Sequence, residues 1–438
     1  MTDAIVVSAY VFGVVVVLLL AYKRRFAFLL CWPYIMYGYG LLVPVLFRDD
    51  PEYAFARQYV SGNALIIAAL ASTATLCIFA ILDGLILGTR NFRALLENEA
   101  ISRSASLLVQ SQGFLALVLV NVTVFICLFT AAWTAGEIGG DYTFRGIERL
   151  TFWGPLGAAT EGVCALSLIY GTAQLMNRGR AKRRYLVEGL LLTCLVARAI
   201  PGTRMPLVMV ALILLATVGL IVRVRLKYIV VVIALACTLY AGATYIGYRR
   251  MGVEFELKPK PLLYALNGET FNTNLTLLIA TRNLDLRFYQ PGFAVAIPAF
   301  VLPSWSVDKV SLLAEWYDRD MYARAVGFDT VAPAGAMHFI ADALIAYGPY
   351  FLIPIAMFGL VVFWALRGRC QLQQLLLFVA LFAVSHHMWR DSWLIAFKSL
   401  CEIYGLEYFA LWLMVRRCER LRRNRWAVGV SPGLEGVH

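Results

Sequence analysis

Runs of roughly 20 apolar residues recur along most of the chain, and this feature constrains the fold more than any other. Helices of about this length cross the ~30 Å hydrocarbon core of a bilayer. The chain is 61% hydrophobic and 15% charged, whereas a soluble domain has roughly 45–50% apolar and 25% charged residues. The sequence therefore predicts an all-α polytopic membrane protein with about 11 transmembrane helices, at about 4–22, 26–47, 63–87, 113–135, 153–176, 185–200, 205–222, 228–248, 349–366, 371–385 and 393–415.

The basic residues of the short connections fall mainly on one side of this bundle. One set of connections holds 22 of the 39 Lys and Arg residues, and the opposite short connections hold seven. Because cytoplasmic loops carry an excess of Lys and Arg, we expect a multi-pass membrane protein with its N-terminus outside and its C-terminus in the cytoplasm. The net charge of +12 mostly records this basic rim, so no nucleic-acid partner is predicted. The first apolar run lacks a basic leader and a cleavage site, which favours a retained helix.

Four regions follow from this topology. Residues 1–248 form an N-terminal bundle of about eight spans, 249–347 a large extracytoplasmic loop with interfacial helices, 348–415 about three further spans, and 416–438 a basic cytoplasmic tail. None of the nine cysteines lies between Thr238 and Arg369, and no CxxC or zinc-type spacing occurs. Neither disulfides in the loop nor a metal site is therefore predicted.

The 249–347 loop has structure of its own in the sequence. Residues 262–282 predict a turn at Asn267-Gly-Glu269, followed by a short amphipathic helix that begins near Thr273 or Thr276. Residues 291–303 are apolar, contain three prolines and are too short to span, which favours an interfacial or re-entrant segment. Residues 335–349 then lead back into the membrane.

His338 and Asp342 are the first candidate catalytic pair. A separation of four residues places both on one face of a helix. A carboxylate beside an imidazole can accept a proton with a tuned pKa or can orient its neighbour. The alternative is a pair at a helix N-terminus that only forms hydrogen bonds.

Arginines at the outer boundary are the candidate anion ligands. Arg198 and Arg204 bracket the tight Pro201-Gly202 turn, and Arg249, Arg250 and Arg390 also fall on that side. Guanidinium groups bind phosphate oxygens through paired hydrogen bonds. Contact with lipid headgroups is the alternative.

Further ionisable residues lie in or beside the predicted spans. Glu161 lies inside the fifth span, and an ionisable residue within a membrane is by default functional or faces a cavity. Residues 386–391, which include His386, His387 and Arg390, are predicted to form the last outer loop. Adjacent histidines on a helix point in different directions, so they do not predict a metal site.

Taken in chain order, these residues resemble a bacterial oligosaccharide repeat-unit polymerase of the Wzy type (O-antigen, capsule or exopolysaccharide). Gly202-Thr-Arg204 before an apolar span is similar to the family's Gly-Ser-Arg turn. The segment 266–272, which contains Glu269, is similar to its Gly-Glu-Phe segment, and 292–303 resembles its Pro-terminated interfacial stretch. Residues 341–348 resemble its Ala-Glu-x-Tyr-x-Asn-Phe-Gly motif, with Asp342, Leu344 and Ala346 in place of Glu, Tyr and Asn. The resemblance covers about 198–348.

This resemblance implies a membrane glycosyltransferase, similar to the C-type enzymes, that uses no nucleotide sugar, metal or other cofactor. It also implies a multi-pass protein of the bacterial cytoplasmic (inner) membrane, with the N-terminus and the 249–347 loop in the periplasm and the C-terminus in the cytoplasm. It implies transfer of the growing glycan from undecaprenyl pyrophosphate to the non-reducing sugar of another lipid-linked repeat unit. The implied partners are the undecaprenyl-pyrophosphate-linked oligosaccharide, membrane lipids, and a chain-length regulator and flippase of the same pathway. The implied roles are pyrophosphate binding by the five outer arginines and deprotonation or orientation of the acceptor by Asp342 or His338, with Glu269, Glu161 and His386 as further candidates.

Two other functions fit parts of the sequence. An O-antigen ligase would use the same lipid donor with a lipid A–core acceptor, and outer arginines and a large loop suit both enzymes. A lipid-linked sugar flippase or other transporter belongs to a different class, and transporters tend to have repeated halves and paired broken helices. Neither of those two features is evident in the sequence.

Overall fold

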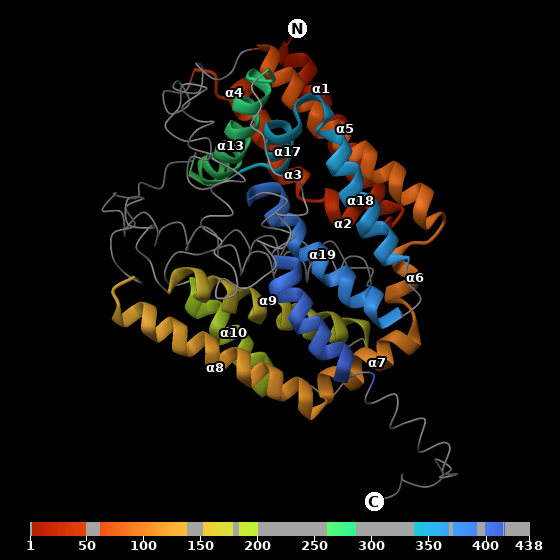
Figure 1. Cartoon of the computed structure of the whole chain (residues 1–438), viewed down its shortest axis with the longest axis vertical. Helices are drawn as coiled ribbons and strands as arrows, with labels where there is room; N and C mark the ends of the chain where they lie inside the picture. Colours follow the sequence, from red (N-terminus) through yellow and green to blue (C-terminus); the bar gives the residue numbers. More distant parts are fainter. Residues whose placement is uncertain are drawn as a thin grey trace, which may run out of the picture.

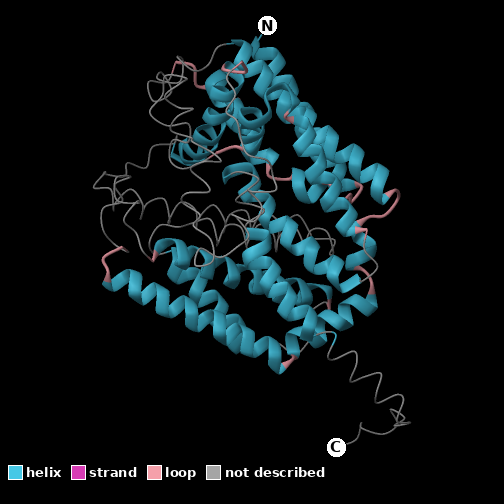
Figure 2. Cartoon of the chain, in the orientation of Figure 1, coloured by secondary structure: helices cyan, strands magenta, loops and turns pink. Residues whose placement is uncertain are grey.

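The structure, a computed structural model, describes residues 2–49, 62–137, 152–177, 184–199, 261–285, 337–367, 371–391, 399–414 and 416. Every regular element in these ranges is helical (Figure 2). Among them, five helical segments are long and apolar enough to cross a membrane, and a bent pair of helices is a sixth candidate. The prediction of an all-helical membrane protein is thus confirmed. The count of eleven spans stays a prediction, because 205–222 and 228–248 lie outside the described residues.

Four of the predicted spans are continuous apolar helices. They are α1 (Thr2–Tyr22), α5 (Gly62–Leu87), α8 (Gln112–Thr134) and α9 (Trp153–Met176). A helix satisfies its own backbone hydrogen bonds, which is the condition for crossing hydrocarbon. Buried Ser and Thr hydroxyls along them, such as Thr75 and Ser167, donate to the carbonyl four residues earlier.

The second predicted span is a succession of short helical pieces. These are α2 (Phe28–Cys31), α3 (Tyr34–Tyr37), the 3₁₀ turn η1 (Gly38–Leu41) and α4 (Val43–Leu46). Pro33 and Pro44 each remove a backbone donor, which interrupts the ladder of hydrogen bonds. Gly40 lets this segment lie close to α13 (Pro261–Arg282), since a Cβ at Gly40 would overlap the carbonyl of Thr270 on that helix.

Residues 261–282 correct the sequence-based expectation. The predicted turn at Asn267-Gly-Glu269 is wrong, because α13 (Pro261–Arg282) is one continuous helix. It packs against η1, α5, α3 and α17, and this burial overrides the local turn preference of Asn-Gly. Two described pieces of the 249–347 loop, α13 and α17, therefore lie within the packed helices.

The helices at the predicted spans 349–366 and 371–385 also differ from the expected bounds. Helix α17 (Phe339–Tyr347) continues through η5 (Gly348–Tyr350) into α18 (Leu352–Leu366) with a bend of 118°. Gly348 has a φ of +56°, which L side chains rarely adopt, and Pro349 follows it. Helix α19 (Gln371–Asp391) passes the predicted end at residue 385, so the expected loop at 386–391 is wrong and those residues are helical.

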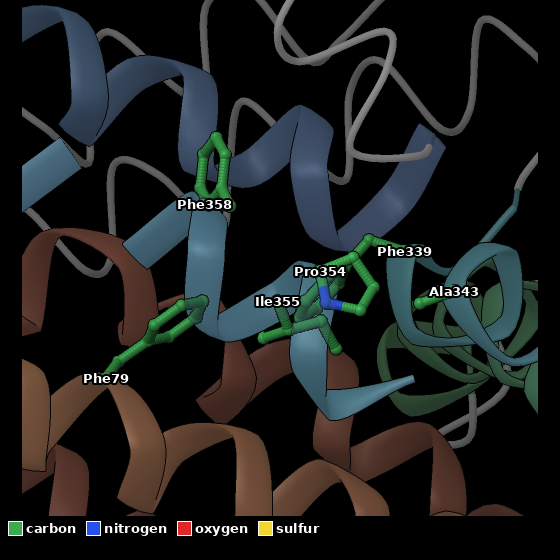
Figure 3. Close-up of a pocket in the computed structure, with 6 residues that line it drawn as sticks. All are labelled: Phe79, Phe339, Ala343, Pro354, Ile355 and Phe358. Atoms are coloured by element: carbon green, nitrogen blue, oxygen red, sulfur yellow. The ribbon is translucent and has the colours of Figure 1, made fainter. Parts of the chain in front are cut away.

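The bend between α17 and α18 leaves a small apolar pocket against α5. Its walls are entirely apolar: Phe79, Phe339, Ala343, Pro354, Ile355 and Phe358 (Figure 3). The space is about 10 Å³, at the lower limit for one water molecule, and a water would find no polar partner there. We therefore interpret it as imperfect packing at the bend and not as a site.

The helices form two groups joined by α19 (Figure 1). The first group contains α1 to α5, α13, α17 and α18. The second contains α7 (Glu99–Gln110), α8, α9, α10 (Tyr185–Ala199) and the C-terminal helical residues, which begin with the π-helical turn η6 (Ser399–Tyr404). The short helix α6 (Phe92–Leu96) leads from one group to the other, and α19 contacts both.

The basic connections meet at one end of this assembly. Arg25 forms an ion pair with the buried Asp83, Arg90 donates to the carbonyl of Arg367 (3.2 Å), and Arg184 donates to the carbonyl of Ser111 (3.3 Å). The opposite end holds the Arg48–Asp3 pair, at 3.2 Å, and the contact between Glu137 and the Phe152 amide. These described parts of the basic connections therefore lie at one end of the helices, while the placement of the other basic connections and the identity of that side as cytoplasmic stay predictions.

Candidate functional site

At the end of α19 away from the basic connections, polar side chains of this helix contact both helix groups. Its residues His386 and Trp389 face the first group, and His387 faces Glu161 of the second group. We name the two resulting sites the histidine–tryptophan cluster (Tyr37, Asn274, His338, His386 and Trp389) and the glutamate cluster (Asn121, Glu161, His387 and Glu407).

Trp389 is the centre of the first cluster. It is fully buried, and its ring lies 5.6 Å from Tyr34, 5.3 Å from His338 and 4.9 Å from Phe339, each in edge-on geometry. Its indole nitrogen donates to the carbonyl of Leu30 at 2.8 Å. A buried indole with its N–H satisfied is a strong packing anchor, so Trp389 fixes α19 against α2, α3 and α17.

His338 has a structural role in the same cluster. It is the N-cap of α17, with extended backbone, and its Nδ1 accepts the Ile340 amide at 3.2 Å. The His338 amide donates to Thr276 Oγ1 of α13 at 3.0 Å. Because Nδ1 accepts a hydrogen bond, the proton of the neutral ring is assigned to Nε2. His338 therefore lies just outside the helix, and the expectation that it shares a helical face with Asp342 is wrong.

Asp342 lies within the first turn of α17 and is buried with the rest of that turn. Its amide donates to the carbonyl of His338 at 3.1 Å, the first hydrogen bond of the helix. Both residues therefore lie at the N-terminus of α17, and a catalytic role for Asp342 or His338 stays a prediction.

Tyr37 and Asn274 connect α3 with α19 and α13 through buried hydrogen bonds. The hydroxyl of Tyr37 lies 2.9 Å from His386 Nδ1, and Asn274 Nδ2 donates to the carbonyls of Tyr37 (2.6 Å) and Thr270 (2.8 Å). The Met337 amide donates to the carbonyl of Arg390 at 2.8 Å. The 335–349 segment and Arg390, singled out separately in the sequence, are therefore neighbours.

The glutamate cluster differs from the histidine–tryptophan cluster because it contains two carboxylates and is partly exposed. Glu161 Oε1 of α9 lies 3.7 Å from His387 Nε2, and both side chains are about one-quarter exposed. Glu161 Oε2 and Glu407 Oε2 are buried, and neither has a hydrogen-bond partner within the described part of the chain. Buried polar atoms are normally satisfied, so each such exception calls for an explanation, such as an unseen water or a catalytic role.

Gly162 holds this cluster together at close range. A Cβ at Gly162 would lie 2.6 Å from Asn121 Oδ1 of α8 and 3.6 Å from Glu407 Oε1. A glycine beside Glu161 thus lets two polar side chains, Asn121 and Glu407, approach the same face of α9. Glu161 is eight residues from the start of α9, so it lies ~12 Å from the end opposite the basic connections.

The other predicted residues have simpler outcomes. Arg198 lies in the last turn of α10 with a buried side chain, and Arg390 is half-buried in the last turn of α19. Glu269 lies on α13, but the description of that helix's side chains begins at Thr270. Arg204, Arg249 and Arg250 lie outside the described residues. Within the described ranges, no three His, Cys, Asp or Glu side chains gather as a metal ion would require.

Several residues of the two clusters were not found from sequence. Tyr37, Asn274 and Trp389 come from three distant segments, and their types carry no signal without the contacts. Glu407 did carry a signal, since it is an ionisable residue within the last predicted span. Comparisons with protein-family models, curated proteins and solved structures find no match to this chain.

Proposed function

We propose that this protein polymerises undecaprenyl-pyrophosphate-linked oligosaccharide repeat units, as the Wzy-type resemblance implies, with its chemistry at the end of the bundle opposite the basic connections. The observation that carries this proposal is the Glu161–His387 pair. It links α19 to α9 of the second group at 3.7 Å, is partly accessible, and retains a carboxylate oxygen without a hydrogen-bond partner among the described residues. An acceptor hydroxyl could occupy that position.

In the proposed reaction, the acceptor hydroxyl oxygen forms a bond to the anomeric carbon of the growing glycan. The bond from that carbon to the pyrophosphate oxygen breaks, and the electron pair leaves with undecaprenyl pyrophosphate. Glu161, alone or with His387, takes the proton of the acceptor hydroxyl as general base. Positive charge from Arg198 and Arg390, and from Arg204, Arg249 or Arg250, stabilises the departing pyrophosphate.

This assignment moves the general base from Asp342 or His338, as the resemblance implied, to Glu161. His338 uses Nδ1 to cap α17 and packs against Trp389, so the histidine–tryptophan cluster better suits a positioning role. Asp342 is buried in the first turn of the same helix. We therefore place the base at Glu161 and assign the 335–349 segment to holding Arg390 in place.

Three interruptions of the helices favour a second function, a transporter of lipid-linked sugars. The second predicted span is broken into four pieces, the α17–α18 pair bends by 118°, and a π-helical turn begins the C-terminal helix. Discontinuous helices of this kind form substrate sites in transporters. An O-antigen ligase also remains an alternative, because it uses the same donor chemistry.

Reconstitution of the purified protein with lipid-linked repeat units, without nucleotide or metal, separates these functions. A ladder of lengthening glycans supports the polymerase, and the ladder should depend on Glu161 and on the arginines, tested as Arg198→Ala and Arg204→Ala. Movement of the lipid-linked unit across the vesicle membrane without elongation supports the transporter. A single transfer to added lipid A–core supports the ligase. A full ladder from the Glu161→Gln variant would contradict the proposed base.

A further inference from the structure

Two adjacent histidines of α19 connect the histidine–tryptophan cluster with the glutamate cluster. The Tyr37 hydroxyl lies 2.9 Å from His386 Nδ1, the His386 and His387 rings are 5.5 Å apart, and His387 Nε2 lies 3.7 Å from Glu161 Oε1. These four side chains, from α3, α19 and α9, form a continuous row through the molecule. Each of them can gain or lose a proton, so the row must adopt one preferred distribution of charge.

The two histidines differ in burial and in the charge of their neighbours. His386 is 1% exposed and lies against the neutral phenol of the fully buried Tyr37, whereas the side chains of His387 and Glu161 are about one-quarter exposed. Burial disfavours the protonated form of an imidazole, and a carboxylate within about 4–6 Å favours it. Two positive rings this close together would also repel each other. A single positive charge on the pair therefore belongs on His387.

Tyr37 is held in place to fix the state of His386. Its carbonyl accepts a hydrogen bond from Asn274 Nδ2 at 2.6 Å, and its ring packs against the His386 ring at 5.4 Å. A phenol that donates to Nδ1 satisfies this nitrogen in the neutral ring and leaves the ring proton on Nε2. We propose that Tyr37 holds His386 as the neutral imidazole with its proton on Nε2, so that His387 carries the positive charge that keeps the Glu161 carboxylate ionised.

The titratable groups around Glu161 agree with a positive charge on His387. Cys164 of α9 and Tyr404 of the C-terminal helical residues lie within electrostatic range of Glu161, and a thiol and a phenol are ordinarily neutral at neutral pH. Glu407 adds a second carboxylate on this side of α9, since its Oε1 would lie 3.6 Å from a Cβ at Gly162. Among these groups of the described chain, none competes with His387 for the positive charge.

This distribution of charge refines the proposed reaction. The inference rests on the proposed function only for its effect on glycan elongation. Within that reaction it makes Glu161 the base and His387 a neighbouring cation, because a protonated imidazole cannot accept a further proton. A carboxylate accepts a proton only while it is ionised, so the cation extends to lower pH the range in which the base works. Tyr37 and His386 act through His387 and are positioning residues.

The test reads the state of each histidine directly and needs no glycan. The chain contains four histidines, so nitrogen NMR of the full-length protein with isotope-labelled histidine gives few signals, which single His→Gln variants assign. At neutral pH we expect His386 to be neutral with its proton on Nε2, and His387 to be protonated on both nitrogens. Glu161→Gln should lower the pH at which His387 loses its proton by about one unit or more. A protonated His386, or a neutral His387 at neutral pH, would overturn the inference.

Tyr37→Phe tests the positioning role, because it removes the hydroxyl and keeps the ring. The single tautomer of His386 should become a mixture of two. Tyr34→Phe is the matched control, since Tyr34 is also fully buried, lies one turn earlier on α3, and directs its hydroxyl to the Ala9 carbonyl at 3.5 Å. It should leave the His386 signals unchanged. Unchanged signals in Tyr37→Phe would contradict the role of Tyr37, and if this variant does not fold, the wild-type signals and Glu161→Gln decide.

The pH dependence of elongation links this charge distribution to the reaction. His387→Gln removes the cation beside Glu161, so the carboxylate should take up a proton more readily and the acid limb of the rate profile should move to higher pH by about one unit. An equal loss of rate at every pH would instead give His387 a structural role and overturn the inference. The expected histidine states without any glycan ladder would count against the proposed function alone. A ladder from a protein with a protonated His386 would count against this inference alone.

Discussion

The two clusters at the end of α19 differ in how their polar atoms are satisfied. In the histidine–tryptophan cluster, the Trp389 indole, His338 Nδ1 and the Tyr37 hydroxyl each have a hydrogen-bond partner. The rings are buried, and one neutral amide oxygen, Asn274 Oδ1, is buried without a hydrogen-bond partner within the described residues. In the glutamate cluster, two carboxylate oxygens have none within the described residues, and the Glu161–His387 pair is partly exposed. A neutral and largely hydrogen-bonded network specifies structure, whereas buried carboxylate oxygens without a hydrogen-bond partner mark a place for chemistry. The two adjacent histidines thus serve different purposes.

The largest expected effect tests the structural side of this comparison. Trp389→Ala removes a fully buried indole and its hydrogen bond to Leu30, and should lower the free energy of unfolding by about 3–5 kcal/mol. The melting temperature of the detergent-solubilised protein measures this loss. Trp364→Ala on α18 is the control, because Trp364 is 73% exposed and should have little effect. Equal losses from both variants would show that Trp389 is not an anchor.

The second prediction tests the chemical side. Glu161→Gln keeps the shape of the side chain and removes its charge, so the rate of glycan elongation should fall about a hundredfold, or ~2.7 kcal/mol in activation free energy. The melting temperature should stay the same or rise, because an incompletely paired buried carboxylate does not stabilise the fold. Elongation rate and unfolding are measured on the same preparation.

Glu97→Gln controls for the loss of a negative charge. Glu97 is about half exposed and pairs with Arg93 at the basic end, so its substitution should change neither property. A fall in stability that parallels the fall in rate would instead make Glu161 a structural residue, and the contrast between the clusters would disappear.

The smallest expected effect tests the spacing within the glutamate cluster. In Gly162→Ala, the new Cβ would lie 2.6 Å from Asn121 Oδ1, so the Asn121 amide must rotate away or α8 must shift, at a cost of up to about 1–3 kcal/mol. Gly157→Ala on the same helix meets no atom within 4 Å and should be neutral or slightly stabilising. Thermal unfolding compares the pair. If Gly162→Ala is as well tolerated as Gly157→Ala, the close approach of Asn121 and Glu407 is not needed.

The sequence was most informative where one physical requirement acts alone. Long apolar runs predicted α1, α5, α8 and α9 because a chain in hydrocarbon must satisfy its backbone internally, whatever its neighbours. It was less informative where neighbours decide the outcome. Asn267-Gly-Glu269 has the local chemistry of a turn, yet packing on η1 and α5 keeps α13 helical. Residues 386–391 are polar enough for a loop, yet Trp389 is buried and keeps them on α19.

The sequence by itself determined that this is a helical membrane protein with its basic connections on one side, because burial in lipid and the bias of Lys and Arg act on composition. It also identified His338, Asp342, Glu161, His386 and Arg390 as unusual for their positions. Only the tertiary structure decided their neighbours. His338 became a helix cap, and Glu161 acquired His387 as its partner. Hydrogen bonds and close approach depend on distances of a few ångströms between residues that are far apart in the chain, which no local pattern specifies.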